Sequence, residues 1–191
     1  MIDALSSLEF YRRGVVEQPV CASDHIQPFL DAGVKNVWVY YCCSQGKLVP
    51  NRFFAMPSAR NRIMGVLMYL TGVKGFLQWG YNFYYTQFSR ALTAPFTVTH
   101  CDYAFPSGDA FLVYPGPDGE PLTSLRAEVQ SEGLTDLRAL QTLEAHAGRE
   151  AVERLVLENA GMESMSYTQY PVSASYLLTL REAVFDALET V

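Results

Sequence analysis

The stretch that decides the fold runs from residue 34 to residue 85, VKNVWVYYCCSQGKLVPNRFFAMPSARNRIMGVLMYLTGVKGFLQWGYNFYY. Residues 34–43 are rich in β-branched and aromatic side chains, which predict a buried strand. Residues 58–72 carry apolar side chains at helical spacing and end on Gly72, so they predict a helix. Residues 73–85 predict the next strand. A strand, a helix and a second strand in this order predict a parallel βαβ unit.

The flanking segments continue this alternation of strands and helices. The other expected elements are strands over 2–6 and 110–114, an extended piece over 19–22, and helices over 23–33, 123–148, 149–161 and 173–191. Ser23 or Asp24 is the expected N-cap of its helix, and Gly33 its expected end. A break is expected near Gly133. With 191 residues, the chain is long enough for one α/β domain with a sizeable core.

Composition and charge exclude several classes of partner. The net charge is −6 and Lys and Arg do not cluster, so we expect no nucleic acid and no membrane-surface role. The longest apolar run, residues 63–73, is too short to cross a bilayer. Aromatic residues make up 13% of the chain, which indicates that some of them line a pocket.

The chain offers no pattern for a metal or a cofactor. Its four cysteines are Cys21, Cys42, Cys43 and Cys101, and the adjacent pair in a strand would point to opposite faces. Neither a dinucleotide-binding glycine motif nor a P-loop is present, so no cofactor is expected. The first residues lack the apolar core of a signal peptide. A cytoplasmic location is expected if Met1 is the true start, and the compartment is otherwise unknown.

Several uncommon strings occur in one order: NVWVYYCCSQGKLVPNRF, MPSARNRIMGVLMYLTGVKGFLQWGYNFY and SGDAFLVYPGPDGEPLTSLRAEVQSEGLTDLRAL. From about Ile2 to Leu143 the chain resembles the C-terminal half of the domain-of-unknown-function 4091 family, which is related to the glycoside hydrolase family 123 catalytic domain. The resemblance implies the C-terminal part of a (β/α)8 TIM-type barrel followed by C-terminal helices. The implied parallel strands are Ile2–Ser6, Val37–Cys42, Gly75–Asn82 and Ala110–Tyr114. We therefore expect a half-barrel over 1–145 and a helical extension over 146–191.

The resemblance also implies a carbohydrate substrate. Characterised members of family 123 are β-N-acetylgalactosaminidases, which use a consecutive Asp-Glu pair in substrate-assisted hydrolysis of N-acetylated amino sugars. No Asp-Glu dipeptide occurs in this sequence. The expectation is thus a part of a longer hydrolase that is inactive by itself. A non-catalytic carbohydrate-binding barrel and an inactive truncated remnant are the alternatives. The open sheet edges of a half-barrel also predict self-association.

In such barrels the carboxyl ends of the strands face the active site. The expected substrate-binding residues are Trp79, Asn82, Tyr81, Tyr84, Tyr40, Tyr41 and Glu9, and the catalytic residues are not identified. An indole ring can stack on the apolar face of a sugar, while an amide can bind its hydroxyl or acetamido group. Trp79 and Asn82 would meet only if the strand ends or bulges near Gly80. The alternative is that Trp79 fills the barrel interior.

Other polar residues have plainer interpretations. Glu9 is expected to be a solvated acid or a partner of a nearby arginine. Asp24 is expected to cap a helix beside an exposed His25, in preference to forming half of a relay. Asp109 precedes a strand, so it should lie away from the site unless the long loop before it folds over. Arg126 is expected to form structural pairs.

Overall fold

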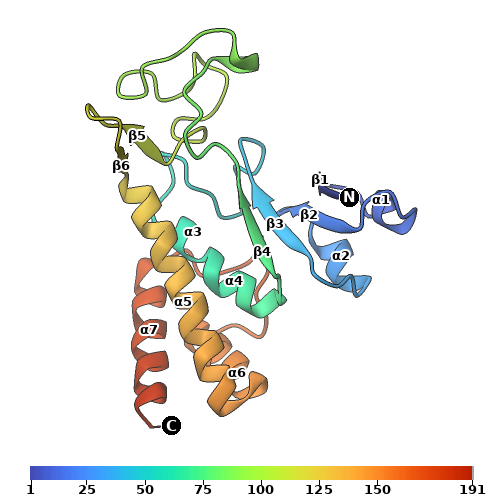
Figure 1. Ribbon diagram of the computed structural model, residues 1–191. Coiled ribbons are helices and arrows are strands. Elements are labelled where there is room, and N and C mark those ends of the chain that lie inside the picture. The colour runs from blue at the N-terminus through green and yellow to red at the C-terminus, as the bar shows by residue number, and fades with distance from the viewer. Residues whose placement is uncertain (191) are drawn as a thin grey trace.

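The computed structural model describes residues 1–190 (Figure 1). Its strands are β1 (Ile2–Leu5), β2 (Gln18–Ala22), β3 (Trp38–Tyr41), β4 (Gly75–Gln78), β5 (Val113–Pro115) and β6 (Pro121–Thr123). Its helices are α1 (Glu9–Arg12), α2 (Gln27–Asp31), α3 (Ala59–Arg62), α4 (Met64–Thr71), α5 (Leu125–Ala147), α6 (Arg149–Ala160) and α7 (Ala174–Glu189), with a 3₁₀ turn, η1, at Gln87–Ser89. Val191, the last residue of the expected final helix, lies outside the described residues.

Four parallel strands form one sheet, in the spatial order β1-β2-β3-β4. Spatial order equals chain order, because each strand is followed by a helical crossover that returns the chain to the same edge. In the register, Val39 pairs with Cys21 on one side and with Phe76 on the other. The predicted α/β class with four parallel strands is confirmed by this sheet.

One of the four expected strands is wrong. Residues 113–115 are not in the parallel sheet; they pair antiparallel with β6 in a separate hairpin. The missing place is taken by β2, which the sequence suggested only as a short extended piece. Pro19 makes this segment look unsuitable for a sheet interior, because proline has no N–H to donate. Tertiary pairing with β1 and β3 nevertheless holds it in place.

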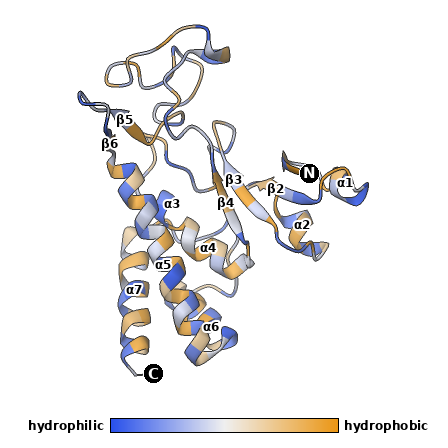
Figure 2. Cartoon of the chain, viewed as in Figure 1, coloured by the Kyte–Doolittle hydropathy of each residue, from blue (hydrophilic) through white to orange (hydrophobic). Residues whose placement is uncertain are grey.

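The main core lies between one face of the sheet and the helices. Leu5, Cys21 and Val39 are buried on that face, and they share a hydrophobic cluster with residues of α4, α5, α6 and α7. Figure 1 shows α5, α6 and α7 running side by side below the sheet, with the C-terminus at their far end. Figure 2 shows hydrophobic and hydrophilic residues alternating along these helices, as one-sided burial requires. On the opposite face of the sheet, Trp38, Tyr40 and Leu77 are only half-buried.

The expected C-terminal ends of two helices are confirmed, whereas the expected N-cap of α2 is not. Gly33 and Gly72 end their helices in left-handed conformations, with φ of +65° and +68°, as predicted. The expected N-cap of α2 is wrong: the helix begins at Gln27, and no side chain caps its first turn. Asp24 is therefore free to make other contacts.

The expected break at Gly133 is also wrong, because α5 is continuous from Leu125 to Ala147. Gly133 is needed for packing. A β-carbon added there would lie 2.6 Å from the backbone oxygen of Arg62, so the glycine allows α5 to approach the turn between α3 and α4 closely. Gly65 of α4 faces the Gly133 carbonyl at the same crossing.

The C-terminal helices α6 and α7 share the main core with α5. The expected boundary between residues 145 and 146 falls in the last turn of α5, and the division of the chain into two parts stays a prediction. Through residue 190, the helices are all too short or too polar to serve as membrane spans.

Candidate functional site

The long segment between β4 and α5 extends beyond the carboxyl end of β4 (Figure 1), and its later part brings Asp109 back to Trp79. It has a small core of its own, which we call the loop cluster: buried Cys101, Ala110 and Phe111 with partly buried Trp79, Phe83, Tyr84, Ala104, Phe105 and Tyr114. Several of the other aromatic side chains of the segment are exposed, Phe88 and Tyr103 most of all. The loop cluster explains how an irregular segment keeps an ordered position at this edge of the sheet.

Trp79 lies where the strand β4 gives way to this segment. The strand ends at Gln78, near Gly80 as the sequence allowed, and Gly80 adopts a left-handed conformation with φ of +60°. The indole packs against the rings of Phe105 and Phe83, with centroids 5.1 and 6.0 Å away. Its Nε1 donates a hydrogen bond of 3.4 Å to Oδ1 of Asp109. The residue is half-buried, so part of it remains accessible.

A buried ion pair between Arg52 and Asp109 contacts Trp79. Arg52 and Asp109 are both fully buried, and Nη1 of Arg52 lies 3.1 Å from Oδ1 of Asp109. Nη2 of Arg52 donates to the backbone oxygens of Trp79, at 3.1 Å, and of Asp109. The guanidinium also lies 4.9 Å from the centre of the Tyr41 ring. The pair therefore fixes both the backbone and the indole of Trp79.

Burial dominates the electrostatics of this pair. Desolvation raises the pKa of the Asp109 carboxyl, although the Arg52 guanidinium attracts the carboxylate. Desolvation likewise lowers the pKa of Arg52. Two ions that lose their hydration in this way depend on each other, so the loss of either partner leaves a costly buried charge.

A second buried network continues from the pair toward α5. The Tyr41 hydroxyl donates to Oδ1 of Asn61 at 3.0 Å, and Nδ2 of Asn61 donates to the Arg126 backbone oxygen at 2.9 Å. Nη1 of Arg126 donates to the carbonyl of Phe111 at 2.7 Å and to that of Gly108. Within residues 1–190 Arg126 forms no ion pair, in contrast to the expected structural pairing; its bonds to these carbonyls tie α5 to the segment that carries Asp109.

The other expected site residues fall into two groups. Tyr81 and Asn82 follow Trp79 and are exposed, while the Tyr84 hydroxyl is occupied by a 2.8 Å hydrogen bond to the Val113 carbonyl. Through residue 190, no hydrogen bond joins Trp79 to Asn82.

On the neighbouring strand β3, Tyr40 is half-buried and Tyr41 is fully buried. Burial raises the pKa of the Tyr40 hydroxyl. Glu9 is exposed after β1 and pairs with Arg13 at 3.4 Å, in agreement with its plainer interpretation.

Sequence reasoning did not assign Asp109 to this edge of the sheet. Because Asp109 precedes an expected strand, it was expected at the end of the sheet away from the site unless the long loop folded over. The end of that loop does return, and it places Asp109 beside Trp79. Arg52 and Asp109 are 57 residues apart, so no local pattern links them. The one available signal was charge: a lone arginine and a lone aspartate stand in stretches that are otherwise apolar or neutral.

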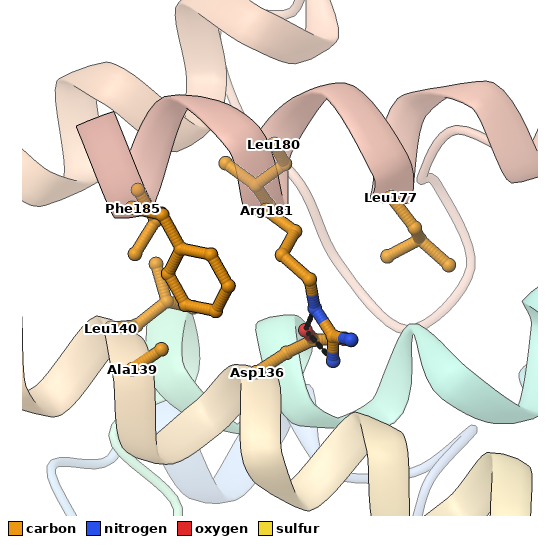
Figure 3. Close-up of a pocket in the computed structure, with 8 residues that line it drawn as sticks. Asp136, Ala139, Leu140, Leu177, Leu180, Arg181 and Phe185 are labelled. Atoms are coloured by element: carbon orange, nitrogen blue, oxygen red, sulfur yellow. Dashed lines mark hydrogen bonds and ion pairs between the residues drawn. The ribbon is translucent and has the colours of Figure 1, made fainter. Parts of the chain in front are cut away.

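A pocket between α5 and α7 lies away from this edge (Figure 3). Its apolar walls include Leu140, Leu177 and Phe185. Arg181 of α7 reaches Asp136 of α5 at 2.6 Å, and Arg62 pairs with the same carboxylate at 2.7 Å. These contacts join three helices, so we interpret the pocket as a gap in helix packing. Across residues 1–190, His, Cys, Asp and Glu side chains form no group suited to a metal ion.

Aromatic and polar side chains thus gather beyond the carboxyl ends of the parallel strands. Enzymes with a parallel α/β sheet bind their substrates at this end of the strands. The sequence model of the family described as "Glycoside hydrolase 123, catalytic domain" matches residues 1–143, and the chain belongs to this family. The match confirms the predicted relation to family 123 and a glycoside hydrolase-like domain with a carbohydrate substrate. The relation to family 4091 stays a prediction. Among curated proteins, none matches the chain.

Proposed function

We propose that this chain supplies one half of a (β/α)8 barrel whose carboxyl edge binds N-acetylated amino sugars. The repeating unit of such a barrel is one strand followed by a helix, and the sheet contains four parallel strands in chain order with helical crossovers between them. The remaining strands would come from outside residues 1–190. In the complete protein we expect hydrolysis of a glycosidic bond next to the amino sugar.

The observation that carries the proposal is the placement of Trp79. A half-buried indole held at its Nε1 by Asp109 offers a fixed apolar surface to the C–H face of a sugar ring. The exposed Asn82 and Tyr81 follow it and supply amide and hydroxyl groups for hydrogen bonds. Tyr41 is proposed to act indirectly, since it is buried and supports Arg52 through its ring.

The chain's own carboxylates do not supply the chemistry by the route of family 123. The sequence has no consecutive Asp-Glu pair. Asp109 is close to Trp79, but it is fully buried and paired with Arg52, so it cannot reach a glycosidic oxygen. We therefore assign sugar binding to this chain and leave acid-base catalysis to residues outside it.

Sugar binding can be tested by fluorescence. The chain contains two tryptophans, so a Trp38→Phe variant leaves Trp79 as the sole tryptophan. N-acetylgalactosamine should change the emission of this variant in a saturable way, and galactose should do so only at higher concentration. In NMR titrations, Trp79→Ala should abolish the shifts that N-acetylgalactosamine causes in the wild-type protein.

A matched control is Tyr103→Ala, which removes an aromatic ring that is 87% exposed on the same loop segment. It should bind the sugar as the wild-type protein does. Equal binding by Trp79→Ala and the wild-type protein would show that the indole is not the sugar platform. Equal affinity for galactose and N-acetylgalactosamine would contradict the preference for amino sugars.

A further inference from the structure

An aspartate-histidine pair lies at the same edge of the sheet as Trp79. Asp24 and His25 come directly after β2, and Trp79 comes directly after β4. The carboxyl ends of parallel strands meet at one edge, and these two strands are separated only by β3. Two strand spacings correspond to about 10 Å. A ligand resting on Trp79 would therefore have the pair within reach of its far side.

The geometry of the pair defines the state of the imidazole. Nδ1 of His25 lies 2.8 Å from Oδ1 of Asp24. A carboxylate can only accept a hydrogen bond, so Nδ1 carries a proton; in the neutral imidazole this leaves the lone pair on Nε2. The His25 side chain is 52% exposed, which leaves Nε2 available to a ligand.

A buried glutamine holds the carboxylate in place. Nε2 of Gln45 donates to Oδ1 of Asp24 at 3.1 Å, while its Oε1 accepts from the Cys42 backbone N–H at 2.9 Å. Asn51 donates to the backbone oxygens of Gln45 and Cys42, at 2.7 and 2.9 Å, and fixes the turn between them. A chain of hydrogen bonds thus runs from the end of β3 through Gln45 and Asp24 to the imidazole.

Helix capping does not account for this arrangement. The helix α2 begins at Gln27, and no side chain caps its first turn. Next to the pair, the Ser23 hydroxyl is buried and has no hydrogen-bond partner among the described residues. Buried hydroxyl groups normally have a partner, so a bound water is expected at this hydroxyl, one residue before the pair.

We propose that His25 is a second polar contact of the sugar site, where its Nε2 accepts a hydrogen bond from a sugar hydroxyl. Asp24 and Gln45 are positioning residues that fix the ring and its tautomer. The inference rests on the proposed sugar-binding function and extends the site from β4 to β2. The sugar would lie across the carboxyl ends of three neighbouring strands, with its apolar face on Trp79 and a hydroxyl on His25.

The tautomer can be measured directly. Long-range ¹H–¹⁵N spectra of the full chain distinguish Nδ1–H from Nε2–H imidazoles, and a His25→Gln variant identifies the signals of His25. We expect the Nδ1–H form in the wild-type protein and a mixture of the two forms in Asp24→Ala. An Nε2–H form in the wild-type protein would overturn the proposed acceptor role.

Binding provides the second test, with N-acetylgalactosamine as the probe in NMR titrations. Loss of one hydrogen bond should weaken the affinity of His25→Ala by about 2- to 10-fold. The matched control is His146→Ala, whose imidazole is exposed at the end of α5. It should bind as the wild-type protein does.

The possible outcomes separate the two proposals. If His25→Ala binds the sugar as tightly as the wild-type protein while Trp79→Ala does not bind, the role of His25 is overturned and the proposed function stands. If the wild-type protein shows no saturable shifts, both are overturned. Weakened binding by His25→Ala and by Asp24→Ala, with unchanged melting temperatures, would support the proposal.

Discussion

Removing the carboxylate of the buried pair should destabilise the whole domain. In Asp109→Ala, Arg52 would keep its contacts with Asn51 Oδ1 and the Trp79 carbonyl, both at 3.1 Å, but it would lose its counter-ion in a site with no solvent access. Breaking a buried ion pair in this way costs about 3–5 kcal/mol of the free energy of unfolding. For a domain of this size, that corresponds to a fall in melting temperature of about 6–20 °C.

The same substitution should change the environment of Trp79, whose Nε1 loses its acceptor. Urea denaturation followed by both far-UV circular dichroism and tryptophan fluorescence measures the two effects together. The control is Asp118→Ala, which removes an exposed carboxylate from the turn between β5 and β6 and should change the free energy of unfolding by less than about 0.5 kcal/mol.

A double variant, Arg52→Met with Asp109→Ala, isolates the interaction between the two charges. Removing both should cost less than the sum of the single substitutions, because no unpaired charge remains. The reasoning is refuted if Asp109→Ala lies within about 1 kcal/mol of the wild-type protein, or if the two single effects simply add.

Three further outcomes are expected. Gly133→Ala should lower the melting temperature, because its β-carbon would lie 2.6 Å from the Arg62 carbonyl; the control Ser131→Ala, exposed on the same helix, should leave the melting temperature unchanged or raised. Tyr41→Phe should cost about 1–3 kcal/mol in urea denaturation, because Oδ1 of the buried Asn61 loses its donor, whereas the exposed Tyr85→Phe should be neutral. The chain should self-associate in analytical ultracentrifugation, since β1 and β4 are each paired on one side in the described sheet; a monodisperse monomer would contradict this expectation.

Most of the helices and the strands β1, β3 and β4 could be predicted from local patterns. Residues 38–41 and 75–78 form strands where β-branched and aromatic side chains gather, and Gly72 ends its helix as its position indicates. The two errors in strand assignment concern how a segment pairs, which its own composition does not specify. Residues 110–114 have the composition of a buried strand, yet only Val113 and Tyr114 of them lie in a strand, which pairs with β6 in a hairpin. Residues 18–22 contain a proline, yet two neighbouring strands enclose them.

The sequence by itself determined the class of the fold, the family, and the aromatic residues beyond β4, because these depend on residue types at short spacing. Only the tertiary structure decided the polar part of the candidate site. Arg52 forms an ion pair with Asp109 because the long segment after β4 returns Asp109 to the carboxyl end of the sheet. The carboxylate of Asp24 binds the imidazole of His25 instead of capping α2, and Gln45, 21 residues away, donates a hydrogen bond to the same carboxylate. Hydrogen bonds between distant segments form only after the core has fixed the backbone, so local sequence patterns do not specify them.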